Sequence, residues 1–270
     1  MYGTNRCKGM VLRFVFPFPG PSGTGDGNHP FVPGGNIMIK KNAQGRIWEL
    51  DFLRGTALIL MVYFHVIVDL KDMYNMNLSY LSGVNYYIGK ISAILFMLLA
   101  GISSSLSRSN VKRGIRVFAI ALVISLVTHL YGPEFGIKFG ILHFLGICML
   151  LYPLMARIHK YLLIVIGTGI ILLGNVFLRI TPSTNILFPL GIYNASFSSA
   201  DYYPLVPWMG VFIYGIVLGK LLYSRKRSLF PFEYRDNIIN MTGRNTLLIY
   251  VIHQPVILLV LYILKLAGLI

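Results

Sequence analysis

The sequence is poor in charged residues and very poor in cysteine, and each scarcity argues against a class of protein. Only 12% of its 270 residues are charged, about half the share found in a soluble domain. The two cysteines, Cys7 and Cys148, are too few for a disulfide framework, and no metal site or cysteine-held cofactor is expected from them. Acidic residues are the scarcest charged group, with nine Asp and Glu against 24 Lys and Arg. An ordinary soluble enzyme and a disulfide-rich secreted domain are both unexpected.

What the chain has in abundance is apolar sequence. Hydrophobic residues make up 56% of it, and the mean hydropathy is +0.68, which is typical of an integral membrane protein. Seven apolar stretches each approach the roughly 20 residues that a membrane-spanning helix needs. They cover residues 52–70, 86–106, 114–132, 137–156, 160–179, 204–223 and 245–265. We therefore expect an all-α, polytopic bundle of about seven transmembrane helices.

The net charge of +15 would suit a nucleic-acid-binding protein, but the positions of the charges indicate membrane topology instead. Nineteen of the 24 Lys and Arg lie in alternate segments: the N-terminal part through Arg54 and the 103–116, 157–160 and 220–244 connections. Four lie in the other set, and Lys90 is inside the second stretch. The positive-inside rule then predicts a cytoplasmic N-terminus and an external C-terminus. No partnership with nucleic acid is expected.

Residues 1–45 differ from the rest of the chain. The stretch 16–27, Phe-Pro-Phe-Pro-Gly-Pro-Ser-Gly-Thr-Gly-Asp-Gly, is rich in Pro and Gly and has no periodicity. We predict that residues 1–45 are a disordered N-terminal extension and that residues 46–270 form the transmembrane domain. Whether residues 1–37 are part of the natural protein is left open, because Met38 could be its start.

The first stretch carries the strongest functional signal. Arg54 and His65 are eleven residues apart, so they share a helix face and lie roughly 16 Å apart along the axis. Asp69 follows His65 at i+4, on the same side. Ionisable groups inside a membrane helix are costly and usually functional, so this face is a candidate site.

Four further residues fall in the outer half of the predicted bundle: His129, His143, Trp208 and His253. A lone histidine in a membrane helix often serves only as a hydrogen-bonding group between helices. For His129 that interpretation is favoured, and for His143 the two interpretations are balanced. Trp208 is also typical of the aromatic belt at a membrane interface.

Four blocks in order resemble the heparan-alpha-glucosaminide N-acetyltransferase catalytic-domain family in its short bacterial form. The first is Arg-Ile-Trp-Glu-Leu-Asp-Phe-Leu-Arg-Gly-Thr-Ala-Leu-Ile-Leu-Met-Val, from residue 46. The later ones are Phe-Gly-Ile-Leu-His-Phe-Leu-Gly (139–146), Pro-Leu-Val-Pro-Trp-Met-Gly (204–210) and Gly-Arg-Asn-Thr-Leu-Leu-Ile-Tyr-Val-Ile-His-Gln-Pro (243–255). The resemblance runs from about residue 46 to the end. The spacing of Arg54 and His65 is also similar to the first-helix motif of the wider transmembrane acyltransferases that modify surface sugars.

This resemblance implies acetyl transfer from cytoplasmic acetyl-CoA to an amine or hydroxyl of a sugar or glycan acceptor on the outer side. His65 would act as general base or acyl carrier, and Asp69 would orient its ring. The remaining assignments are catalytic positions for His143 and His253, acceptor contacts for Trp208 and His129, and binding of the CoA phosphates by Arg54, Arg113, Arg116 and Arg244. The expected setting is the lipid of a bacterial inner (plasma) membrane, with no metal, and a homodimer is left open.

A different class of function remains open at this point. A transporter or flippase of a polar substrate would also place polar residues in mid-membrane. Acid–base groups at His65 and Asp69 favour the enzyme, as does the lack of an internal repeat, which many transporters have. The acceptor, the acyl group and the order of the transfer steps are not determined by the sequence.

Overall fold

A computed structural model describes residues 47–232 and 237–270. The extension predicted for residues 1–45 lies outside the described residues and stays a prediction. Arg235, one of the basic residues assigned to the cytoplasmic side, is also outside them.

The described chain is helical throughout, which confirms the predicted all-α class. Its α-helices are α1 (Trp48–Tyr74), α2 (Gly83–Leu106), α3 (Asn110–Tyr131), α4 (Ile141–Ala156), α5 (Lys160–Phe177), α6 (Leu205–Leu222), α7 (Ile238–Arg244) and α8 (Thr246–Leu266). Two short 3-10 helices, η1 (Pro133–Phe135) and η2 (Phe188–Leu190), lie in the connections that follow α3 and α5.

Each of the seven predicted stretches is a helix. Among the described residues, six helices are long and apolar enough to cross a membrane, namely α1, α2, α3, α5, α6 and α8. The remaining one, α4, is apolar but has only 16 residues. It begins at Ile141 because Phe139 is held in an extended segment, where its carbonyl oxygen accepts a hydrogen bond from the backbone N–H of Tyr203 at 2.9 Å. Gly140 precedes the helix with extended backbone angles.

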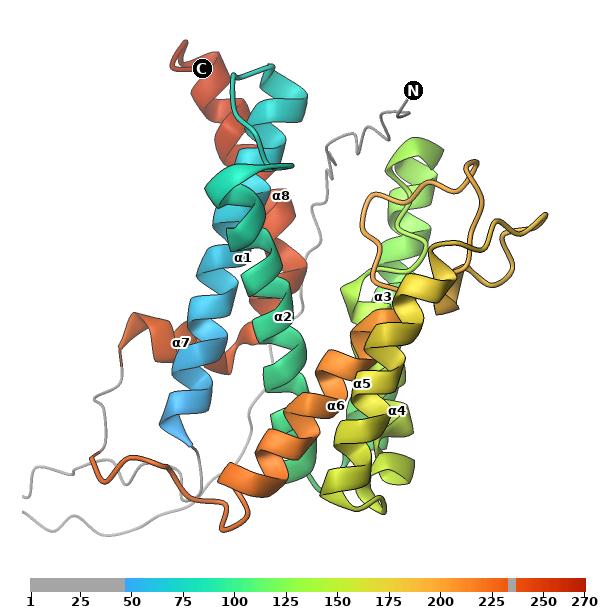
Figure 1. Cartoon of the computed structure of the whole chain (residues 1–270). Coiled ribbons are helices and arrows are strands. Elements are labelled where there is room, and N and C mark those ends of the chain that lie inside the picture. Colours follow the sequence, from blue (N-terminus) through green and yellow to red (C-terminus); the bar gives the residue numbers. More distant parts are fainter. Residues whose placement is uncertain (1–46, 233–236) are drawn as a thin grey trace, which may run out of the picture.

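The helices run alternately up and down, as the charge pattern predicts. In Figure 1 the α2–α3 and α4–α5 connections lie at the lower end of the bundle, where α1 begins, and the α1–α2 connection lies at the upper end with the C-terminus. The basic connections therefore share one end, which we call the basic end. That this end faces the cytoplasm remains a prediction from the positive-inside rule.

The short helix α7 is not predicted by the sequence pattern. Its N-cap, Asn237, accepts a hydrogen bond from the backbone N–H of Asn240 at 2.8 Å. The helix crosses the first turns of α1 at very close range: a Cβ on Gly55 would overlap the carbonyl oxygen of Ile239, and one on Gly243 would overlap that of Asp51. Only glycine permits this approach, which brings the end of α7 beside Arg54.

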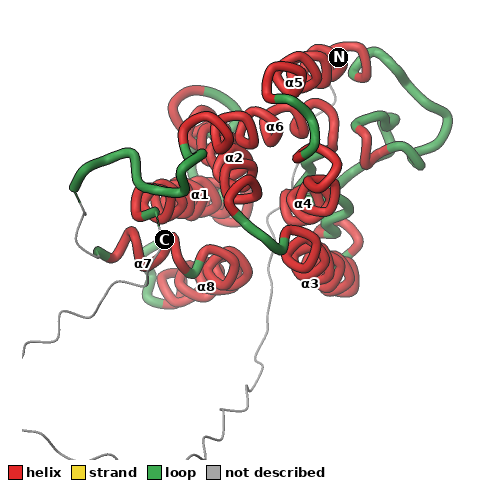
Figure 2. The backbone as a smooth tube through the Cα atoms, turned by 90° about the horizontal axis from the view of Figure 1, so that it is seen from below, coloured by secondary structure: helices red, strands yellow, loops and turns green. Residues whose placement is uncertain are grey.

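The helices form two groups. On one side α1 packs against α2, α7 and α8, and on the other α3 packs against α4. Helix α6 packs most extensively against α2 and α5, and smaller contacts of both α6 and α2 with α4 join the two groups. Viewed along the bundle in Figure 2, α8 and α3 stand on opposite sides of the molecule's interior, and no extensive packing joins them.

The joint between the groups depends on small residues. A Cβ on Gly101 of α2 would overlap the carbonyl oxygen of Phe212, and one on Gly215 of α6 would overlap that of Leu98. In a membrane, where neighbouring lipid is as apolar as the side chains, such close backbone contact is a main source of helix association.

We expect Gly101→Ala to destabilise the bundle by roughly 1–3 kcal/mol, because the added methyl forces α2 and α6 apart. Thermal unfolding of the purified protein in detergent measures this. Gly169→Ala is the matched control, since no atom lies within 4 Å of its added Cβ. Equal melting temperatures for the two variants would contradict the assigned contact.

Candidate functional site

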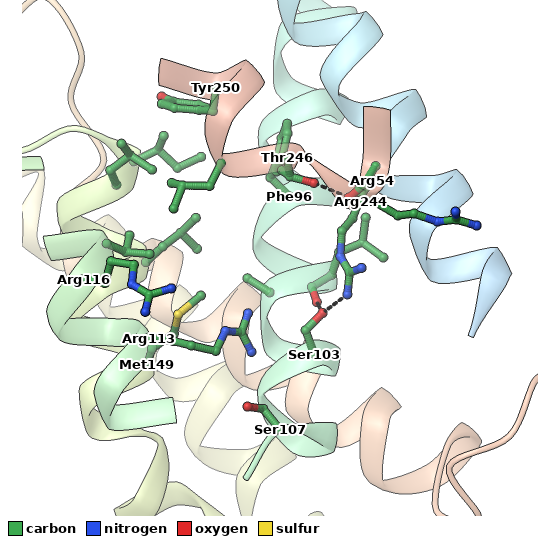
Figure 3. Close-up of a pocket in the computed structure, with 18 of the residues that line it drawn as sticks. Arg54, Phe96, Ser103, Ser107, Arg113, Arg116, Met149, Arg244, Thr246 and Tyr250 are labelled. Atoms are coloured by element: carbon green, nitrogen blue, oxygen red, sulfur yellow. Dashed lines mark hydrogen bonds between the residues drawn. The ribbon is translucent and has the colours of Figure 1, made fainter. Parts of the chain in front are cut away.

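Four arginines gather around a cavity of about 630 Å³ near the basic end. We call it the inner cavity. It lies between α1, α2, α7 and α8 on one side and α3 and α4 on the other, and apolar residues of α2 and α4 line much of the remaining wall. The arginines are those predicted to bind the phosphates of a ligand: Arg54, Arg113, Arg116 and Arg244. They come from three helices, α1, α3 and α7. In Figure 3 Arg113 and Arg116 lie across the cavity from Arg54, whereas the guanidinium group of Arg244 points away from them.

Asp51 organises one side of this cavity. Its Oδ1 atom lies 2.6 Å from Nη1 of Arg54, and its Oδ2 atom lies 3.7 Å from Nε of Arg244. Nη2 of Arg54 also donates a hydrogen bond to Oγ of Ser103 on α2, at 2.6 Å. Buried Asp51 thus hydrogen bonds to Arg54 and forms a longer ion pair with Arg244, so one carboxylate neutralises part of the charge of two arginines from separate helices.

The opposite wall carries Arg113 and Arg116, three residues apart on α3. No described acidic residue forms an ion pair with either one. Four arginines therefore line the inner cavity and no acidic residue in the described part of the chain does, and its volume is in the range of a ligand site, about 300–1,000 Å³. This arrangement suits an anion with more than one charge, since guanidinium groups bind phosphates in bidentate geometry.

A second cavity, of about 470 Å³, lies towards the opposite end and is called the outer cavity. Its lining includes His65 and Asp69 from α1, His253 from α8 and Trp208 from α6. The sequence predicted all four as site residues. Lys90, Asp201 and Gln254 add further polar groups. The outer cavity thus combines acid–base side chains with an aromatic surface.

His65 and His253 meet edge to face, with ring centroids 4.9 Å apart. Nδ1 of His65 is 2.9 Å from the carbonyl oxygen of Met61, and Nδ1 of His253 is 2.5 Å from that of Tyr250. A carbonyl oxygen only accepts hydrogen bonds, so Nδ1 must carry the proton in each ring. In the neutral ring Nε2 then keeps its lone pair, and Nε2 of His253 is buried without a partner among the described residues. Each imidazole is therefore held in the tautomer that a base or nucleophile needs.

Asp69 does not take the partner expected for it. Its Oδ2 atom accepts a hydrogen bond from Nε2 of Gln254 on α8 at 2.8 Å, whereas the ring of His65 is oriented by the backbone of Met61. The predicted pairing of Asp69 with His65 is thus replaced by a link between α1 and α8, one residue from His253. Each of these helices carries one histidine of the pair, His65 on α1 and His253 on α8. The link between Asp69 and Gln254 therefore fixes the distance between the two histidines.

His143 lines neither cavity, unlike the other predicted catalytic histidines. Its Nδ1 atom accepts the backbone N–H of Gly140 at 3.2 Å, so Nε2 carries the proton and faces Oγ of Ser125 at 3.1 Å. That hydroxyl in turn donates to the carbonyl of Ile137 at 2.5 Å. Nδ1 thus caps the start of α4, and Nε2 joins the ring to Ser125 of α3. A structural role accounts for every polar contact of His143.

His129, the remaining histidine prediction, is exposed in the last turn of α3 and also lies outside both cavities. Among the described residues, no three of His, Cys, Asp and Glu come together as metal ligands. The candidate site is therefore narrower than the sequence prediction. Of the predicted residues, His65, Asp69, Trp208 and His253 line the outer cavity, and the four arginines line the inner one.

The two cavities meet at three residues that line both of them: Phe96 of α2, Ile141 of α4 and Tyr250 of α8. We call these residues the partition. The inner cavity lies on its basic side, and the histidine pair lies on the other. A flexible ligand that passed the partition would touch both sets of functional groups at once.

Several site residues were not found from the sequence, although some signals existed. Asp51 lies at i−3 from Arg54, one helical turn away, which is the spacing of an intrahelical ion pair. Asp201 is the only acidic residue in the long connection 178–204. Tyr250 precedes His253 by three residues and so shares its helix face. No local signal indicates Ser103 or Gln254, because their partners lie 49 and 185 residues away.

We expect His143→Phe to lower the free energy of unfolding by about 1–3 kcal/mol, because it leaves the N–H of Gly140 buried without a partner while the ring still packs. His129→Phe, at an exposed position, is the control and should unfold like the wild type. Chemical or thermal unfolding in detergent decides this. An unchanged His143→Phe protein would show that the cap is dispensable.

Asp201 provides a pH-dependent term in stability. Its Oδ2 atom accepts the backbone N–H of Ile141 at 3.0 Å, at the start of α4, and burial raises the pKa of this carboxyl from 3.8 to about 6. Its charge also interacts electrostatically with Tyr203 and Tyr250. The folded protein therefore binds the proton of Asp201 more tightly than the unfolded chain does.

The contribution of Asp201 to stability should be complete below about pH 4 and lost as the pH rises through about 6. Melting temperatures between pH 4 and 7 should consequently fall more steeply for the wild type than for Asp201→Asn, which cannot ionise. Parallel curves for the two proteins would contradict the raised pKa.

Comparison with known proteins identifies one family. The family model described as "Heparan-alpha-glucosaminide N-acetyltransferase, catalytic" matches residues 46–255. The match begins just before α1 and ends within α8 at Pro255, two residues beyond His253. It therefore includes every predicted site residue that lines either cavity. No curated protein and no solved structure matches the chain.

Proposed function

We propose a function from this premise: the chain belongs to the heparan-alpha-glucosaminide N-acetyltransferase catalytic-domain family and is a membrane acetyltransferase by that membership. The donor is acetyl-CoA, bound in the inner cavity, and the acceptor is an amine or hydroxyl of a sugar in the outer cavity. The observation that carries the proposal is the pair of cavities, basic on one side and lined by histidines on the other, that meet at the partition.

The inner cavity suits the phosphorylated end of CoA. This part of the molecule is a multiply charged anion, and guanidinium groups bind phosphate with two parallel hydrogen bonds. Arg54 is oriented before a ligand arrives by its hydrogen bonds to Asp51 and Ser103, and Arg244 lies in ion-pair contact with the same carboxylate. Arg113 and Arg116 on the facing wall would contact the same anion from the other side. Prior orientation of this kind lowers the entropy lost on binding.

The pantetheine arm would pass along the apolar wall of the inner cavity to the partition. It is long, thin and mostly uncharged, and it carries the thioester at its end. Arg54 and His65 lie eleven residues apart on the uninterrupted helix α1, about 16 Å along its axis. With the phosphates bound at Arg54, the thioester would thus lie further along the same helix, near the histidine pair.

His65 would take the proton of the acceptor as general base, or carry the acyl group itself as an acyl-imidazole. In the direct route, the acceptor nitrogen or oxygen bonds to the carbonyl carbon, its proton moves to Nε2 of His65, and the carbon–sulfur bond breaks. CoA leaves as the thiolate and then takes up a proton. His253, in edge contact with His65, would position the reacting groups, and Asp69 would act only through Gln254.

Groups suited to a sugar lie around the remaining wall of the outer cavity. Trp208 offers a flat apolar face, and its ring packs 5.6 Å from that of Tyr203. Asp201 and Lys90 provide a carboxylate and an ammonium group to hydrogen bond with hydroxyl or amine substituents. The basic end would face the cytoplasm of a bacterial plasma membrane, so the acetyl group would cross from CoA inside to a glycan outside.

Binding of acetyl-CoA to the detergent-purified protein tests the donor site. We expect binding in the micromolar range, weakened about 10- to 100-fold in Arg113→Ala, the loss expected for one charge-assisted contact. Arg108→Ala is the matched control, because it removes an exposed positive charge from the same α2–α3 region but outside the cavity. Isothermal titration calorimetry measures all three proteins.

The chemical step is tested separately, with glucosamine as the acceptor and release of CoA thiol as the readout. His65→Ala should bind acetyl-CoA like the wild type but lose transfer. A wild type that binds no acetyl-CoA would overturn the proposal and favour transport of a polar solute through the same two cavities.

A further inference from the structure

Tyr250 occupies a special position in the path proposed above. Of the three residues that line both cavities, it alone has a polar side chain, since the others are Phe96 and Ile141. Its ring meets that of Phe96 edge to face, with centroids 6.4 Å apart, and lies 5.3 Å from the ring of His253. A group that crosses the partition from the arginines to the histidines would pass beside this phenol.

The hydroxyl of Tyr250 is available to a ligand. In Figure 3 the side chain crosses the top of the inner cavity, pointing away from its own helix, with Arg113, Arg116 and Ser107 below it. No hydrogen bond joins this hydroxyl to another residue in the described part of the chain, whereas other cavity tyrosines, such as Tyr80 and Tyr202, donate to protein oxygens. A phenol in an apolar wall without a partner gains most from a ligand oxygen placed beside it.

The location of the phenol matches the place where charge develops during acyl transfer. When a nucleophile bonds to the thioester carbon, the carbonyl electron pair moves to oxygen, which becomes negative. A donor aimed at that oxygen stabilises the transition state more than the ground state, and more strongly in a site from which water is excluded. His253 is fixed by the backbone carbonyl of Tyr250 itself, so the phenol and this imidazole are held on one helical turn.

We propose that Tyr250 is a catalytic residue of this site, whose hydroxyl donates a hydrogen bond to the thioester carbonyl oxygen of acetyl-CoA at the partition. The inference rests on the proposed function. As the intermediate collapses, the carbon–oxygen double bond re-forms, the sulfur leaves with the bonding pair, and the phenol keeps its proton throughout. Phe96 and Ile141 exclude water from the same point.

A phenol that only closes the wall would give different results from one that contacts the carbonyl. Tyr250→Phe keeps the ring and removes the donor alone. Tyr262→Phe is the matched control, because Tyr262 lies on the same helix but is exposed and lines neither cavity. Infrared spectroscopy of acetyl-CoA labelled with ¹³C at the thioester carbon reports the hydrogen bond directly, since such a bond lowers the carbonyl stretching frequency.

With labelled acetyl-CoA bound, we expect the carbonyl frequency to be higher in Tyr250→Phe than in wild type and Tyr262→Phe, which should agree. The dissociation constant should change by no more than a few fold. The rate of CoA thiol release with glucosamine should fall about 100-fold in Tyr250→Phe, the effect typical of losing one oxyanion donor.

Equal carbonyl frequencies in wild type and Tyr250→Phe would overturn the proposal. So would a Tyr250→Phe protein that has a weaker affinity for acetyl-CoA but an unchanged rate, because the ring would then be a wall residue. The wild type shows whether the proposed function itself has failed. In that case it would either bind no acetyl-CoA, or bind acetyl-CoA but release no thiol. If it binds without releasing thiol, the infrared comparison still decides whether the thioester carbonyl lies beside Tyr250.

Discussion

A polar side chain inside an apolar helix bundle is stable only where a partner replaces the water that it has lost. In this chain the partners are backbone groups or polar side chains of the same or an adjacent helix. Asp51 binds Arg54 and Arg244, Asp69 binds Gln254, and His143 closes the start of α4. Each of these contacts also fixes the position of a helix. The polar groups therefore determine the architecture around the cavities as well as the chemistry within them.

The same requirement separates the histidines into two kinds. Backbone N–H groups and carbonyl oxygens cannot exchange roles, so the neighbour of Nδ1 decides which nitrogen carries the proton. At His143 the neighbour is an N–H group and both nitrogens are used. At His65 and His253 the neighbours are carbonyls, which leaves Nε2 with its lone pair in the neutral ring. Residue type alone does not distinguish a helix cap from a base, but the hydrogen-bond partner does.

The separation of charge along the bundle gives the two cavities distinct tasks. Arginines of α1, α3 and α7 surround the inner cavity, and the histidine pair lies beyond the partition, although all these residues border one interior. The joint formed by α2 and α6 holds the two helix groups at a distance that leaves this interior open. The close approach at Gly101 and Gly215 therefore contributes to the site without touching it.

The sequence by itself determined the class of the protein, its seven apolar helices, their alternating direction and the spacing of Arg54 from His65. These features are local: they follow from hydrophobic run length, from charge between the runs and from the rise of one helix. It also singled out the four arginines that line the inner cavity and four of the residues that line the outer one, His65, Asp69, Trp208 and His253.

Only the tertiary structure decided which side chains meet. Asp69 joins Gln254 across 185 residues, α7 carries Arg244 to Asp51 through contacts that only glycines allow, and Tyr250 reaches the partition through the packing of α8 on α1. The physical reason is that a buried polar group takes the partner nearest in space, and helix packing sets that partner.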